Sequence, residues 1–153
     1  MRKIVTTLLA LTLCTAAFPQ KAESLYKQGK TLYDAKNYEQ AFPKLKAAAE
    51  KGHKKAQYRV GLSYDKGRGV TEDDVMAVKW YQKSAAQGYA KAQYQLAKCY
   101  LKGEGVAKDE AKARSWLKKA VKDEKDGQEI LDKIKQDAKE GKESASLMLK
   151  MLK

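Results

Sequence analysis

The fold is decided by one pattern that occurs twice, as KGRGVTEDDVMAVKW at residues 66–80 and as KGEGVAKDEAKARSW at residues 102–116. Both copies contain Gly-x-Gly-Val, followed by Asp, Ala and Trp at the same spacings. When the sequence is compared with itself at an offset of 36 residues, 13 of the 36 positions in 53–88 are identical to those in 89–124. A fixed period of this length indicates an architecture of stacked repeats.

Each period is predicted to form two helices joined by the Gly-x-Gly loop. The apolar residues of the first copy lie on two helical faces. The first face carries Ala56, Val60, Gly61 and Tyr64, and the second carries Val75, Val78 and Ala85 with Trp80 and Tyr81. We expect Gly67 to end the first helix with a positive φ, and Gly69 to turn the chain where a Cβ would clash. Asp73 is suited to capping the second helix. At least one glycine of each pair should therefore have a positive φ.

The two copies resemble Sel-one-like repeats, a subfamily of the tetratricopeptide superfamily, at residues 53–88 and 89–123. Residues 22–52 resemble a shorter tetratricopeptide unit that lacks the Gly-x-Gly-Val insert, so its loop should be four residues shorter. Apolar residues in 126–153 suggest a C-terminal capping helix pair. The resemblance implies an all-α, right-handed solenoid of antiparallel helix pairs, with about three repeats and this cap. Pro43 would kink the second helix of the first unit unless that helix starts late.

The N-terminus has the features of an export signal. Arg2 and Lys3 precede an uncharged, mostly apolar run at residues 4–13, which is too short to span a bilayer. Cleavage after Ala17 would make residues 1–17 a signal peptide and leave no transmembrane segment in the mature chain. Lipidation at Cys14, giving an outer-membrane-anchored lipoprotein, and an uncleaved segment are the alternatives. If the signal peptide is cleaved after Ala17, the predicted location is the periplasm or the extracellular medium.

No convincing catalytic, cofactor or metal site is found, so the chain is predicted not to be an enzyme. Only Cys99 would survive cleavage, and its helical context suggests a small buried hydrophobe. Three Ser-x-x-Lys matches begin at Ser24, Ser63 and Ser115, but the companion motifs of penicillin-recognising enzymes are missing. Weak β-lactam binding or hydrolysis, as suggested for cysteine-rich relatives, is one alternative function. Ser63 stands where Cys99 stands in the next copy, so the paired cysteines of those relatives are missing.

The resemblance implies a module that binds an unknown peptide or protein segment on a concave face lined by the first helix of each unit. Carried over by register, the expected partner-binding residues are Tyr26, Lys30, Tyr33, Tyr58, Leu62, Asp65, Tyr94, Lys98 and Leu101. The alternative for the tyrosines is packing between helices. The net charge of +13 falls to +11 when Arg2 and Lys3 are removed, which leaves a polyanion-binding surface as another alternative. Only four basic residues are Arg, so we expect no specific nucleic-acid binding.

Overall fold

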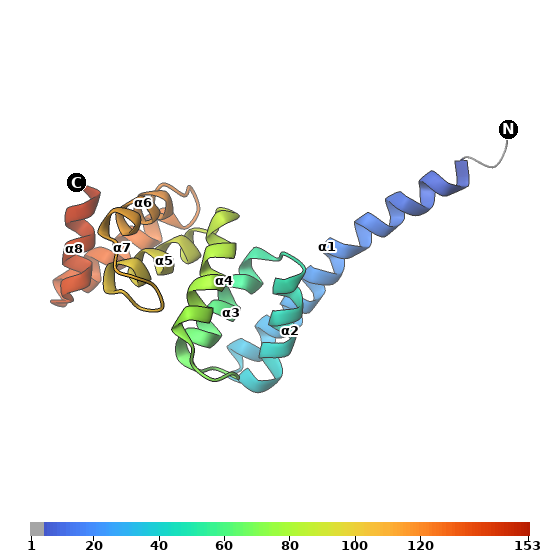
Figure 1. The fold of residues 1–153 in the computed structure, drawn as a ribbon, viewed down its shortest axis with the longest axis horizontal. Helices are drawn as coiled ribbons and strands as arrows, with labels where there is room; N and C mark the ends of the chain where they lie inside the picture. The colour runs from blue at the N-terminus through green and yellow to red at the C-terminus, as the bar shows by residue number, and fades with distance from the viewer. Residues whose placement is uncertain (1–4) are drawn as a thin grey trace.

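The computed structural model describes the backbone of residues 5–153 and the side chains from Gln20 onward. This part of the chain is entirely helical, without a strand (Figure 1). The eight helices are α1 (Val5–Asp34), α2 (Tyr38–Glu50), α3 (Lys54–Lys66), α4 (Asp74–Ala86), α5 (Ala90–Lys102), α6 (Glu110–Val121), α7 (Gly127–Lys139) and α8 (Glu143–Leu152). The predicted all-α repeat fold is therefore confirmed.

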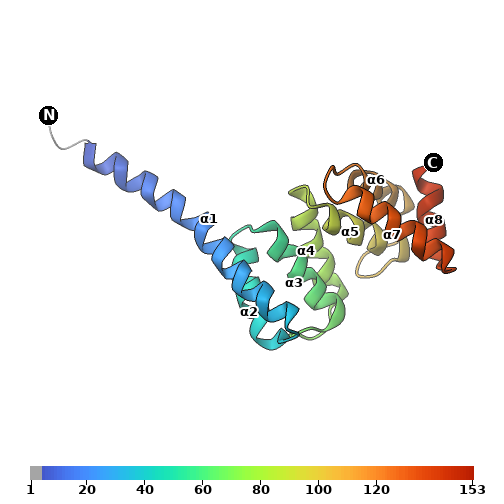
Figure 2. The same ribbon diagram turned by 180° about the vertical axis from the view of Figure 1, so that it is seen from behind.

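The helices form four consecutive pairs that stack on one another. Within the pairs, α1 packs on α2, α3 on α4, α5 on α6 and α7 on α8, and the second helix of each pair contacts the first helix of the next. Figure 1 shows α2 and α4 nearest the viewer, whereas Figure 2, from behind, shows α1 and α7 nearest. The start of α1 projects away from the stacked pairs. Of the predicted signal peptide, residues 1–4 lie outside the described residues, and the backbone of 5–17 belongs to α1.

The Gly-x-Gly loops have the predicted local geometry. Gly67 ends α3 in the left-handed region with φ of 59°, and Gly69 also has a positive φ of 72°. An Asp73 carboxylate oxygen accepts a hydrogen bond from the Met76 backbone N–H at 2.9 Å and caps α4. The next copy repeats these features with positive φ at two glycines and a capping aspartate, at Gly103, Gly105 and Asp109. All four glycines thus confirm the expectation.

The second glycine of each loop also lies against the preceding unit. A Cβ added to Gly69 would lie 2.2 Å from the backbone oxygen of Tyr38, at the start of α2. A Cβ added to Gly105 would lie 2.1 Å from the backbone oxygen of Asp74, at the start of α4. Each loop therefore docks its repeat onto the second helix of the previous pair, and only glycine allows this close approach.

The first unit differs from the others in its loop. Residues 35–37 connect α1 to α2, whereas residues 67–73 connect α3 to α4, and this matches the predicted difference of four residues. Helix α2 does not start late: it begins at Tyr38 and continues past Pro43 to Glu50. Pro43 has no N–H with which to donate to the preceding turn, so α2 tolerates one missing backbone donor.

All four helix pairs contribute buried residues to the core, and the two tryptophans differ in how deeply they are buried. Trp80 is only 6% exposed, whereas Trp116 is half-buried beside the closing pair. The closing pair adds five buried side chains to the larger core cluster, namely Ile130, Ile134, Ala145, Met148 and Met151. Val75 does not belong to the buried face predicted for α4: it lies in the first turn of the helix and its side chain is 52% exposed.

At one contact between paired helices, a small residue faces a large one in the first Sel1 repeat, and both have a different size in the next repeat. A Cβ on helical Gly61 would lie 2.6 Å from ring carbons of Tyr81, which is almost fully buried. The matching positions of the next repeat are Ala97 and Leu117. We expect Gly61→Ala to lower the free energy of unfolding by about 1–3 kcal/mol through overpacking. Adding Tyr81→Leu should recover most of this loss in urea melts, with Tyr81→Leu alone as the control. Strictly additive effects of the two substitutions would contradict the proposed exchange of sizes.

Candidate binding groove

The structure distributes the nine predicted partner-binding residues over three environments. Four of them are buried, namely Tyr26, Tyr33, Tyr94 and Leu101. Four are half-buried, namely Tyr58, Leu62, Asp65 and Lys98. Lys30 is exposed and forms an ion pair with Asp34 one turn further along α1. Members of the set line two cavities beside α5, which are described next.

The first cavity, here called the tyrosine cavity, has a volume of about 260 Å³. It lies between α3, α5 and α7, and its lining includes Tyr58, Tyr94, Gln95 and Ile130. The Tyr58 ring contacts the Tyr89 ring edge-on, with 5.2 Å between the ring centroids. Burial is the main reason that the pKa of Tyr58 lies above its usual range, so the phenol stays neutral and can donate or accept a hydrogen bond.

Charged groups frame the opening of the tyrosine cavity. The Lys91 ammonium lies 3.2 Å from a carboxylate oxygen of Glu129 and 3.6 Å from one of Asp126. Lys133, which also lines the cavity, pairs with Asp137 at 3.8 Å. These pairs are exposed or half-exposed, so they contribute little stability. They place charged side chains around the aromatic side chains of Tyr58 and Tyr94.

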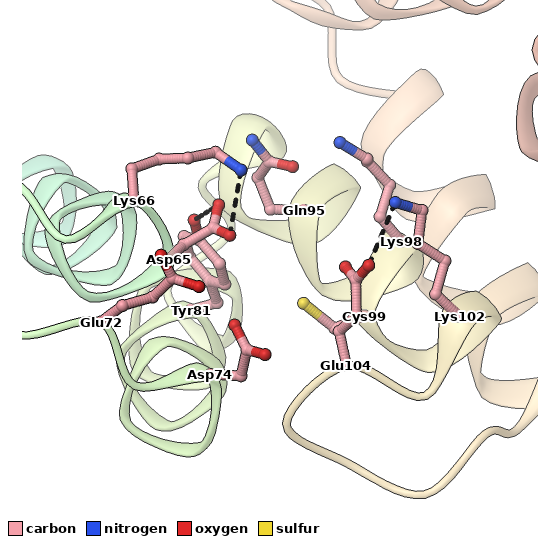
Figure 3. Close-up of a pocket in the computed structure, with 10 residues that line it drawn as sticks. All are labelled: Asp65, Lys66, Glu72, Asp74, Tyr81, Gln95, Lys98, Cys99, Lys102 and Glu104. Atoms are coloured by element: carbon pink, nitrogen blue, oxygen red, sulfur yellow. Dashed lines mark hydrogen bonds and ion pairs between the residues drawn. The ribbon is translucent and has the colours of Figure 1, made fainter.

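The second cavity, here called the charged cleft, has a volume of about 200 Å³ and lies between the second and third pairs. Figure 3 shows Asp65, Glu72 and Asp74 on one side and the α5 residues Lys98 and Lys102 across from them. The cleft therefore has an acidic wall from one repeat and a basic wall from the next.

The walls of the charged cleft are held by internal contacts. The Tyr81 hydroxyl donates to a carboxylate oxygen of Asp65 at 3.1 Å, and the Lys66 ammonium lies 3.3 Å from the other oxygen. Lys102 pairs with Glu104 at 3.2 Å. Desolvation is the main cause that lowers the pKa of Lys98, and no ion pair of Lys98 is found among the described residues.

Gln95 lines both cavities, so they adjoin along the surface of α5. Its side chain also lies beside the Tyr58 hydroxyl and partly offsets the rise in the pKa of Tyr58. We call the continuous surface formed by the tyrosine cavity and the charged cleft the α5 groove. Four of the nine predicted residues line it, namely Tyr58, Asp65, Tyr94 and Lys98. Sequence register found these four positions, but it missed Gln95, which joins the two cavities.

The tyrosines of the first unit have a packing role instead. Tyr26 stacks on His53, with 4.3 Å between the ring centroids. His53 Nδ1 accepts a hydrogen bond from the Ala56 N–H and caps α3, while Nε2 contacts Glu23 at 2.9 Å. Capping by His53 was not predicted, because histidine is not among the residues that favour this position.

Tyr33 is buried beneath arginine side chains. The Arg68 guanidinium donates to the Tyr33 hydroxyl at 3.0 Å, and the Arg59 guanidinium lies 4.9 Å from the centre of the ring. Arg68 belongs to the Gly-x-Gly loop of the next pair, so this contact joins the first two pairs. Packing between units, the alternative reading of the tyrosines, therefore accounts for Tyr26 and Tyr33.

Nucleophilic side chains are poorly placed for chemistry. Burial raises the pKa of the Cys99 thiol to about 12, so it stays protonated although it lines the charged cleft. Ser63, the first residue of one Ser-x-x-Lys match, is fully buried, whereas Ser24 and Ser115 lie exposed on helix surfaces. Among the residues with described side chains, no three His, Cys, Asp or Glu groups are arranged to hold a metal ion.

Among the described residues, no helix combines the length and the apolar character needed to cross a bilayer.

Comparison with known proteins places the repeats in a family. The Sel1 repeat family model matches residues 54–89 and 90–123. A Sel1 repeat protein from Oxalobacter formigenes has a similar structure, with a TM-score of 0.64, 38% identity and coverage of 76% of this chain and 47% of that protein. No curated protein matches the chain.

Two further solved structures are similar. One is a protective antigen present in uropathogenic Escherichia coli strains that displays an SLR fold, with a TM-score of 0.68, 28% identity and coverage of 92% of this chain and 32% of that one. The other is Helicobacter pylori cysteine rich protein B, with a TM-score of 0.55, 25% identity and coverage of 60% and 69%.

The lengths of these proteins differ from that of the present chain. It spans about half of the Oxalobacter formigenes structure and about a third of the Escherichia coli antigen. The repeated Gly-x-Gly loops, the stacked helix pairs and the family match agree with one another. Residues 54–123 match two consecutive Sel1 repeats, and the structure of the chain is similar to those of Sel1/SLR repeat proteins, a tetratricopeptide-like superfamily.

Proposed function

We propose that this chain is an exported protein-interaction module whose α5 groove binds a peptide or protein segment. Sel1-repeat folds commonly serve as protein-interaction modules. The proposal rests on one observation: the aromatic tyrosine cavity and the charged cleft adjoin at Gln95. A groove of this kind can accept successive side chains of one bound segment.

The dimensions of the groove favour a segment over a small molecule. The two cavities have volumes of about 260 Å³ and about 200 Å³, each below the roughly 300–1,000 Å³ of ordinary small-molecule sites. Each is suited to one side chain at a time. Tyr58 is held by neighbouring rings before any partner arrives, so binding would cost little side-chain entropy.

Export is part of the proposal and rests on residues 1–17. Cleavage after Ala17 would release a periplasmic or secreted protein, and lipidation at Cys14 would leave it anchored to the outer membrane. Intact-mass measurement of the protein recovered from its host separates the two. A mature chain beginning at Phe18 supports cleavage, a lipid-modified Cys14 supports anchoring, and an intact Met1 in the cell fraction contradicts export.

The binding experiment uses one substitution that fills the groove. We expect Gln95→Arg to obstruct both cavities, while Gln128→Arg, on an exposed site of α7 outside the groove, makes the same chemical change elsewhere. The wild type and both variants are immobilised and incubated with an extract of the native envelope. Bound proteins are quantified by mass spectrometry, and a synthetic peptide from the enriched protein is then titrated.

Obstruction of a central position should weaken peptide binding at least about tenfold in Gln95→Arg and leave Gln128→Arg unchanged. Thermal melts check that both variants are folded. Equal peptide binding by all three proteins would refute the groove as the binding site. A Tyr58→Ala variant that loses stability but binds equally once folded would show that this tyrosine only packs.

A further inference from the structure

The second helices of the two Sel1 repeats present lysines on matching exposed sides, and at one matched position, Lys83 and Lys119, both residues are lysine. The exposed positions of α4 after its first turn are Lys79, Gln82, Lys83 and Ala86. The matching positions 36 residues later are Ser115, Lys118 and Lys119 of α6 and Lys122, which follows the helix as its C-cap. We call the five lysines among these eight positions the outer lysine face. The eight positions include no acidic residue.

Helix periodicity explains why these residues share a surface. Lys79, Gln82, Lys83 and Ala86 are spaced i, i+3, i+4 and i+7, so they lie along one side of α4. The core-facing side of α4 carries buried residues, including Ala77, Trp80 and Tyr81. Because α6 occupies the same place in the next repeat, the four matching positions extend the surface. Lysines that are scattered along the sequence thus become one array.

The outer lysines differ from the basic residues of the first helices in their partners. Most of those residues pair with acids, as in Lys27–Glu23, Arg59–Asp34, Lys66–Asp65, Lys91–Glu129 and Lys135–Asp132, although Lys98 does not. In the part of the chain with described side chains, no outer lysine forms an ion pair. Lys79 and Lys83, and likewise Lys118 and Lys122, are like charges at i and i+4, which repel each other. The array therefore carries uncompensated positive charge.

Tryptophans orient two of these lysines in the same way. The Lys83 ammonium lies 4.3 Å from the centre of the Trp80 ring, and the Lys119 ammonium lies 4.4 Å from that of Trp116. This cation–π contact recurs at matching positions and holds each ammonium close to its helix. It also covers the indole faces, which are then not free to stack on bases.

We propose that the outer lysine face binds an anionic polysaccharide. The array spans two successive repeats, which fits a linear polymer with regularly spaced sulfate or carboxylate groups. Lysine is a compact point charge, whereas nucleic-acid recognition favours the arginine fork and base stacking. Membrane docking needs apolar side chains that insert, and Val75 is the one large apolar side chain that is exposed among those described. This surface is independent of the α5 groove.

The test compares two variants with the same change in charge. The outer variant replaces Lys79, Lys83, Lys118 and Lys122 with glutamine. The control variant replaces Lys27, Lys108, Lys135 and Lys142, each of which is exposed and ion-paired outside the outer face. Binding to a heparin oligosaccharide is measured by calorimetry at several salt concentrations. Duplex DNA and vesicles of phosphatidylglycerol and phosphatidylcholine serve as the other anionic probes.

We expect the outer variant to bind heparin about tenfold or more weakly at physiological salt, with a shallower salt dependence, because fewer counterions are released. The control variant should stay close to the wild type, and circular dichroism verifies that both remain folded. Equal losses in the two variants would overturn the proposal, because they would show only a general charge effect. Tighter wild-type binding to DNA or to the vesicles than to heparin would overturn the polysaccharide assignment.

Discussion

Replacing Trp80 with alanine is expected to lower the free energy of unfolding by about 3–5 kcal/mol, the usual cost of truncating a buried tryptophan. The side chain is 6% exposed and packs in a cluster with Ala56 and Val60 of α3 and with residues of the first pair. A domain of this size is stabilised by only about 5–15 kcal/mol, so the loss would be severe. Stacked repeats contact only their neighbours, and Trp80 lies where two such neighbours meet.

Trp116→Ala is the matched comparison, because Trp116 occupies the same position one repeat later but is half-buried. Urea denaturation should show a smaller loss for Trp116→Ala than for Trp80→Ala. Trp80→Phe is a second control, since the indole N–H of Trp80 has no hydrogen-bond partner in the structure and its loss should cost little. A larger loss for Trp116→Ala would mean that the closing pair α7–α8 is the main packing element.

Gly105→Ala should be the most damaging single methyl addition, lowering the free energy of unfolding by about 2–5 kcal/mol. Two costs combine at this residue. Its φ of 66° is unfavourable for alanine, and the added Cβ would meet the backbone oxygen of Asp74 at 2.1 Å. Backbone atoms cannot rotate away as the end of a side chain can. The third pair would therefore have to move away from α4.

Gly103→Ala separates these two costs. Its φ of 76° is equally unfavourable, but the nearest atom to an added Cβ is 3.5 Å away, so only the conformational cost of about 1 kcal/mol applies. Urea melts of the two variants should differ clearly. Hydrogen exchange should also show faster exchange of the amides at the start of α4 in Gly105→Ala alone. Similar melts would indicate that loop conformation, and not contact between repeats, makes these glycines necessary.

The two surfaces of the solenoid carry charge in different ways. Most basic residues of the first helices form ion pairs, as Lys66 and Lys91 do beside the α5 groove, whereas the outer lysines on the second helices of the Sel1 repeats form none. Two partners of different chemistry could therefore bind at once without competing. The groove variant Gln95→Arg and the lysine variants test the two surfaces separately.

The sequence by itself determined the features that depend on residues close together in the chain. The 36-residue period predicted the helix pairs. The Gly-x-Gly motif predicted the positive φ angles and the ends of α3 and α5. Asp73 was predicted as a cap, and the shorter loop of the first unit followed from its missing insert. These features rest on contacts within a few residues, so the local sequence contains the information for them.

Only the tertiary structure decided which of these residues meet across repeats. It buried Tyr26 and Tyr33 between units, left Val75 in solvent and brought Gln95 to the junction of two cavities. It also placed Gly105 next to the backbone of α4, and it exposed the lysines of the outer lysine face, which are scattered along the sequence. Exposure and close approach depend on neighbours that are distant in the chain and on how the helix pairs stack. A periodic pattern assigns a residue to a side of its helix, but it does not say what covers that side.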